Sequence, residues 1–215
     1  MSMFSMGAAK GVSVASSFLP AGIHKVRFTG MNLANAGESN VVEFKFESVD
    51  GSGIHNERIF EPRSSERTTS QFGENPSEAE QFTLKISQII SALDPELAKK
   101  IDENGDRFQA PDFPSFVNLL KKYLDNKVGT ETYIKLVPSG NYVNFPRYIA
   151  SINKDGVLYI NNKFIGNNLA LTAKEARSIE EASRAKPTSM AEADDEIDEI
   201  KNSFKDAKID DEMPF

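Results

Sequence analysis

The feature that most constrains the fold is a strict alternation of apolar and charged residues that ends in a glycine-rich turn. Within residues 42–47, Val, Phe and Phe alternate with Glu, Lys and Glu, which is the period of a strand with one buried face. Asp50-Gly51-Ser52-Gly53 follows, and glycine tolerates the positive φ angles of tight hairpin turns. We therefore predict paired strands at 42–47 and 54–60, with Phe44 and Phe46 in the core.

Further strands are predicted on both sides of a helical region. Residues 23–30 alternate with Val26 and Phe28 on one face, and the polar stretch 32–40 indicates a loop. Two hairpins are predicted downstream, one joining 133–137 to 142–149 and the other joining 157–160 to 163–165.

Helices are predicted in the middle of the chain. Ser77 followed by Glu80 has the spacing of a capping box, and an apolar stripe follows from Phe82 to Leu93. A short helix is expected over 95–101 and a second amphipathic helix over 113–124. A weaker helical pattern covers 169–185.

This order of elements predicts a mainly β fold, a β-barrel of the OB-fold-like type, because short antiparallel strands flank one block of helices. An open α+β sheet is the alternative, since barrel closure leaves no mark in a sequence. The predicted organisation is a flexible N-terminal arm at 1–20, the β-rich domain at 21–170 with a helical insertion at about 77–127, a weak helix at 171–185, and a disordered acidic tail at 186–215.

The acidity of the chain lies at its C-terminal end. The formal net charge is −7, and residues 190–215 hold ten acidic and three basic side chains, which account for all of it. The rest of the chain is balanced, so the net charge does not argue against a basic groove on the domain.

The last six residues combine acids with an apolar, aromatic end. Asp210, Asp211 and Glu212 precede Met213-Pro214-Phe215. A terminal Phe suits an apolar pocket with a cation for its carboxylate, and the acids would steer the tail towards a basic rim on a partner. The tail can also compete with DNA for the protein's own groove. Acidic tails that only increase solubility are the plainer explanation.

Asp-Asp-Glu-Met-Pro-Phe resembles the tip of bacterial single-stranded DNA-binding proteins, whose tails end in acids followed by Ile-Pro-Phe or Leu-Pro-Phe. The helical insertion and the N-terminal arm look more like the single-stranded DNA-binding proteins of tailed bacteriophages. The resemblance implies a protein that coats single strands in replication, recombination or repair. It also implies recruitment of a polymerase, helicase or primase through the tip.

A surface for single-stranded DNA needs cations for phosphates and aromatic rings for bases, and the sequence offers both. The predicted phosphate contacts are Lys25, Arg27, Lys45, Arg58, Arg63, Lys135 and Arg147, with Arg67 in a loop that clamps the backbone. The predicted stacking residues are Phe60, Tyr133, Tyr142 and Tyr148, and Asn144 is expected to bond base edges. For each aromatic, a place in the core explains the pattern equally well.

Other classes of function find little support. The chain has no cysteine and two histidines outside any paired ligand spacing, and no phosphate-binding glycine loop occurs. We expect no enzyme, cofactor or metal. A protein–protein adaptor is the main alternative, and a metal-dependent nuclease the second. No apolar run is long enough for a membrane helix, so a cytoplasmic location is expected, in the host cell if the protein is viral. Homo-oligomers are possible.

Overall fold

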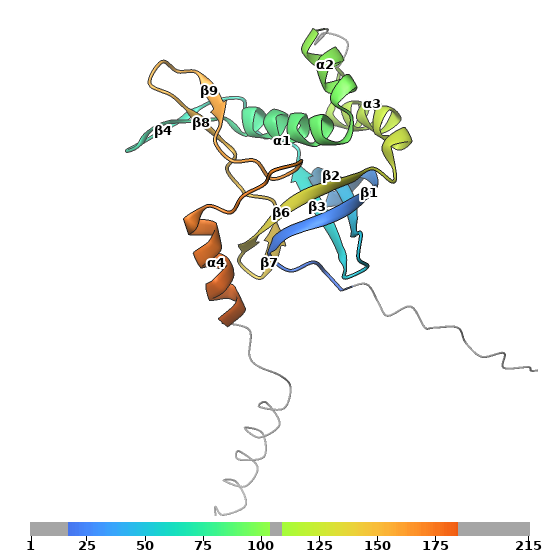
Figure 1. Ribbon diagram of the computed structural model, residues 1–215. Helices are drawn as coiled ribbons and strands as arrows, with labels where there is room; N and C mark the ends of the chain where they lie inside the picture. The colour runs from blue at the N-terminus through green and yellow to red at the C-terminus, as the bar shows by residue number, and fades with distance from the viewer. Residues whose placement is uncertain (1–16, 104–108, 185–215) are drawn as a thin grey trace, which may run out of the picture.

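A computed structural model describes residues 17–103 and 109–184 of the chain (Figure 1). Residues 1–16 of the arm predicted at 1–20, the tail at 186–215 and its tip, Asp210 to Phe215, lie outside the described residues. The strands are β1 Gly22–Ala36, β2 Ser39–Ser48, β3 Ile54–Phe60, β4 Thr68–Ser70, β5 Gly73–Asn75, β6 Glu131–Ser139, β7 Tyr142–Asn144, β8 Ala150–Ile152 and β9 Leu158–Ile160. The helices are α1 Glu78–Leu93, α2 Pro95–Glu103, α3 Phe113–Leu124, a 3-10 turn Asp125–Lys127 and α4 Ala173–Arg184.

The main sheet has five antiparallel strands in the order β3-β2-β1-β6-β7. β1 is the central strand and pairs first with β6 and then with β2 along its length. Two small sheets, β4–β5 and β8–β9, stand apart from it. Figure 1 shows both of these hairpins projecting from the body near the start of α1.

The loop predicted at 32–40 is wrong, because β1 continues to Ala36 and the turn is confined to the two residues before β2. A register shift between Phe28 and Gly30 inserts one extra residue into β1. This bulge moves the buried positions from Val26 and Phe28 to Met31, so the alternation breaks although the strand continues.

Helices α1, α2 and α3 begin where the sequence predicts, and α4 begins at Ala173, two residues after the predicted start. Ser77 accepts the backbone N–H of Glu80, and the Glu80 carboxylate accepts the backbone N–H of Ser77, so the capping box of α1 is confirmed. The Asp112 side chain caps α3 by accepting the Ser115 N–H at 2.7 Å. Both helices cover the same face of the sheet (Figure 1).

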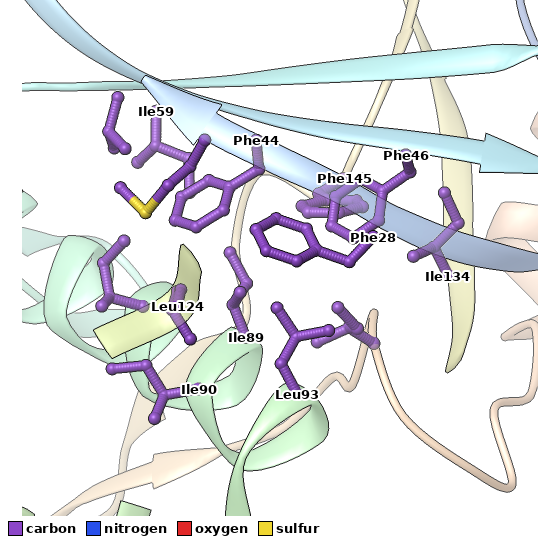
Figure 2. Close-up of a cluster of buried hydrophobic side chains, with 14 of the residues drawn as sticks. Phe28, Phe44, Phe46, Ile59, Ile89, Ile90, Leu93, Leu124, Ile134 and Phe145 are labelled. Atoms are coloured by element: carbon purple, nitrogen blue, oxygen red, sulfur yellow. The ribbon is translucent and has the colours of Figure 1, made fainter. Parts of the chain in front are cut away.

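The core lies between that sheet face and the helices, and its centre is aromatic (Figure 2). The ring centroids of Phe28 and Phe46 lie 5.8 Å apart, and Phe145 lies 6.1 Å from Phe46 and 4.3 Å from Phe164. α1 adds Ile89, Ile90 and Leu93. The core positions predicted for Phe44 and Phe46 are confirmed, since both side chains are buried.

The two hairpins predicted near the end of the domain differ from the structure. β7 ends at Asn144, because Pro146 follows and has no N–H for a ladder. β9 pairs with β8 across a turn in which the Asn153 side chain accepts the N–H groups of Asp155 and Val157. Residues 163–165 do not pair with β9; Ile165 bridges to Ile134 of β6 instead.

The last residues of the predicted N-terminal arm are held by the fold. The Ser17 carbonyl accepts the Ile54 N–H, and the Leu19 N–H donates to the Ile54 carbonyl, both at 2.9 Å. Leu19 is buried in the core. A β-carbon at Gly53 would lie 2.2 Å from the Ser17 oxygen, so glycine is needed for this close approach.

Over the described residues the fold is mainly β, with a five-stranded antiparallel sheet and four α-helices. No ladder joins β3 to β7 within this part of the chain. Instead the Glu57 carboxylate accepts the Phe145 N–H at 2.9 Å and contacts the His55 ring nitrogen at 3.0 Å. None of the described helices is long and apolar enough to cross a membrane.

Candidate nucleic-acid interface

An open cleft of about 820 Å³ lies where β3, the β4–β5 hairpin and the first half of α1 meet. It combines aromatic and basic side chains from segments that are far apart in the sequence. Among the residues that line it are Phe60, Arg63, Phe72, Lys85, Arg147 and Tyr148.

Three aromatic side chains of the cleft are exposed. Phe72 is 91% exposed, Tyr148 63% and Phe60 52%, in contrast to the buried phenylalanines of the core. Phe60 faces outward because the alternation of β3 points Glu57 and Ile59 inward. Exposed rings of this kind present flat faces on which nucleic-acid bases can stack.

Two cations of the cleft, Lys85 and Arg147, are not in direct contact with a carboxylate of the residues that the structure describes. The Arg147 guanidinium lies 5.3 Å from the centroid of the Tyr148 ring, a cation–π contact. Burial lowers the pKa of Lys85, a change opposed by buried Glu57 and reinforced by Arg147. Among the described residues neither forms an ion pair. Arg63 bonds a hydroxyl, that of Ser39, at 3.2 Å.

Acidic residues also line the cleft, and two of the three carboxylates are engaged in hydrogen bonds. Glu61 accepts from the Asn40 side chain at 2.7 Å, and Glu78 accepts the backbone N–H of Arg63 at 2.9 Å. Glu66 is the third. The lining therefore holds three carboxylates beside its three cations, Arg63, Lys85 and Arg147.

The cations predicted on the sheet are paired with glutamates and lie outside the cleft. Lys25 and Arg27 contact Glu131 at 2.8 and 3.2 Å. Hydrogen bonding to Glu131 raises the pKa of Lys25, and both cations lower the pKa of Glu131. Lys45 and Arg58 share the nearly buried Glu43 at 3.6 and 3.0 Å. Each phosphate contact here would have to compete with an existing ion pair.

Lys135 is removed from the predicted interface by its burial. Its side chain is 1% exposed, and its ammonium group donates to Glu175 at 3.0 Å, to the Ala170 carbonyl at 3.1 Å and to Asn162. The segment after β9 covers this face of β6, which strand parity alone could not indicate. The side chain fastens the start of α4 to the sheet.

The remaining predicted residues also lie outside the cleft. Tyr133 is 39% exposed beside its cross-strand neighbour Lys25, and Tyr142 is 75% exposed at the start of β7. Asn144 is half-buried. Arg67 makes ion pairs with Glu74 and Glu80. Of the predicted residues, the structure brings together Phe60, Arg63, Arg147 and Tyr148.

Sequence reasoning missed two residues of the cleft. Phe72 lies in the polar stretch 62–76, where an isolated phenylalanine between turn residues is a signal that could have been used. Lys85 lies within the apolar stripe of α1, and nothing in its neighbours marks it as a ligand-binding cation.

Comparisons with protein-family models, with curated proteins and with solved structures find no match. Within the described residues, no group of three or more His, Asp or Glu side chains could hold a metal ion.

Proposed function

We propose that the protein binds single-stranded DNA in the cleft, with little dependence on base sequence. The observation that carries this proposal is the meeting of three exposed aromatic rings with Lys85 and Arg147 in one cleft. Aromatic rings stack on bases, and each stacked base contributes about 1–3 kcal/mol to the binding free energy, while cations contact the phosphates. Paired strands in a duplex do not offer their base faces, so the cleft favours the single strand.

The order of the strands supports an OB-fold-like interpretation of the domain. Three consecutive antiparallel strands are followed by helices and then by strands that return to β1. The two ends of this sheet, β3 and β7, approach each other through Glu57 and Phe145. Folds of this type commonly bind single-stranded nucleic acids.

The acidic tail completes the proposed role. We propose that the protein coats single strands in replication, recombination or repair and is not an enzyme. Its tip, Asp210 to Phe215, would recruit a polymerase, helicase or primase. The terminal Phe would enter an apolar pocket of that partner, and the acids would steer the tail towards a basic rim.

The test is an anisotropy titration of labelled oligo-dT beside a duplex of equal length, at several salt concentrations. Two or three phosphates neutralised in the cleft predict a slope of log affinity against log salt of about −1.4 to −2.1. Tyr148→Ala should weaken binding about fivefold or more through lost stacking. Absence of single-strand binding at low salt would refute the proposal and leave the adaptor as the better explanation.

A further inference from the structure

Arg67 joins three separate elements through one guanidinium group. Its Nε and Nη2 donate to Glu80 of α1 at 3.0 and 2.8 Å. Its Nη1 donates to Glu74 of β5 at 3.3 Å and to the carbonyl of Gly156 in the β8–β9 turn at 3.2 Å. The two projecting hairpins are thereby tied to each other and to α1.

The helix side of this contact is itself rigid. Glu80 accepts the Ser77 backbone N–H in the capping box while it receives the Arg67 guanidinium. Hydrogen bonding to Arg67 lowers the pKa of Glu80, and Glu80 raises that of Arg67, so both groups keep their charges. Bidentate pairs of this kind fix direction as well as distance.

The β4–β5 hairpin has no core of its own. All six residues of its two strands are exposed, and an isolated two-stranded hairpin is marginally stable at best. Phe72 lies in its turn, where the Phe72 N–H donates to the Ser70 hydroxyl at 3.2 Å. Contacts at the base of the hairpin therefore determine where the most exposed ring of the cleft is held.

We propose that Arg67 is a positioning residue: it holds the β4–β5 hairpin so that Phe72 stacks on a base in the cleft. The inference rests on the proposed binding of single-stranded DNA. Arg67 would contact no phosphate, because four of its five N–H donors are already directed at two carboxylates and a carbonyl. It would act by ordering the hairpin before DNA binds, so that less conformational entropy is lost on binding.

The salt dependence of binding separates a positioning role from a phosphate contact. Loss of a phosphate contact reduces the salt slope by about 0.7, whereas loss of a positioned ring lowers affinity without changing the slope. Arg67→Ala should therefore weaken oligo-dT binding about fivefold or more with the wild-type slope. Arg67→Lys keeps the positive charge but cannot make the bidentate hydrogen bonds of the planar guanidinium, so it should show the same loss of affinity.

A double-mutant cycle tests whether Arg67 acts through Phe72. Phe72→Ala alone should weaken binding about 5- to 150-fold, the range of one lost stacking contact. Arg67→Ala added to Phe72→Ala should cause little further loss, because the ring that Arg67 positions is gone. Arg184→Ala is the matched control, since Arg184 has an exposed ion pair with Glu180 on α4 and should bind like wild type.

A fluorescent reporter follows the ring directly. The chain has no tryptophan, so Phe72→Trp introduces a single one. Its emission should be quenched when oligo-dT binds, and Arg67→Ala in this background should reduce both the quenching and the steady-state anisotropy of the free protein. Circular dichroism melting of every variant identifies any that fail to fold, and Arg67→Lys serves in place of Arg67→Ala if needed.

Additive losses in the cycle would overturn the positioning role, because the two side chains would then act independently. A salt slope reduced by about 0.7 in Arg67→Ala would overturn it too and make Arg67 a phosphate contact. Wild-type affinity in both Arg67 variants would overturn it as well. In each case the wild-type protein still binds oligo-dT, which distinguishes this failure from failure of the proposed function.

Discussion

Lys25 and Arg147 are both basic residues on the surface of a β-rich domain, but their electrostatic surroundings differ. Lys25 lies 2.8 Å from Glu131, whereas Arg147 rests on the Tyr148 ring. An exposed ion pair contributes little to stability, yet it lowers the positive potential that a phosphate would feel. The cleft cations should therefore dominate the proposed binding, although the sheet has more basic residues.

Replacing Lys85 and Arg147 together by Ala should reduce the salt slope for oligo-dT by about 1.4, because two phosphate contacts are lost. The matched double variant Lys25→Ala with Arg27→Ala should change the slope little, since both cations are already engaged in ion pairs with Glu131. Anisotropy titrations at four salt concentrations provide the slopes. Equal effects of the two double variants would contradict the assignment of the interface to the cleft.

Lys135 allows a second prediction, about stability. Lys135→Met removes the partner of a largely buried carboxylate, so the free energy of unfolding should fall by about 3–5 kcal/mol. Urea denaturation measures the change. Lys121→Ala, which breaks an exposed pair with Asp125, should cost only about 0.3–0.5 kcal/mol. Unchanged DNA affinity of the folded Lys135 variant would agree with its place outside the interface.

At the scale of elements, local chemistry determined what could be predicted. The start of α1 was predictable because Ser77 and Glu80 form a purely local capping box. The partner of β9 was not predictable, because a turn either before or after β9 was compatible with the sequence. The turn before it is favoured by the hydrogen bonds of Asn153, and the β8–β9 ladder has only three residue pairs. The C-terminal half of β1 was not predictable, because the bulge exchanges the buried and exposed positions of the strand and so breaks the apolar alternation.

Gly53 gives a prediction at the same scale. Gly53→Ala would drive a methyl group against the Ser17 carbonyl and should cost about 1–3 kcal/mol of stability, as overpacking does. Amide exchange should then accelerate at Leu19 and Ile54, whose N–H groups join the N-terminal segment to β3. Mass spectrometry of exchanged peptides measures this, and unchanged exchange would show that the segment contributes little.

For the molecule as a whole, the cleft is a product of tertiary structure. Its aromatics come from the end of β3, from the β4–β5 turn and from the stretch after β7, so no window of sequence contains it. The residue types needed for single-strand binding were visible in the sequence. Which of them meet, and which are neutralised or buried, depended on pairings between distant strands.

The uneven distribution of charge leads to a prediction for the whole chain. Residues 190–215 account for the net charge of −7, so truncation after Lys186 should tighten oligo-dT binding or leave it unchanged, because a competing polyanion is removed. The melting temperature should stay near that of the full chain, since the core lies within residues 17–184. A clear loss of DNA affinity would show that the tail contributes to binding.

The contact between β3 and β7 has a consequence for how such a domain can evolve. A backbone ladder tolerates almost any side chain, but here a polar link is made by one side chain, the Glu57 carboxylate of β3, which accepts the N–H of Phe145 directly after β7. A substitution at position 57 would remove this hydrogen bond, whereas the packing of the Phe145 ring against Phe46 and His55 would remain. Descendants of this chain could therefore change the strength of this contact through one side chain, without rebuilding the sheet that carries the cleft.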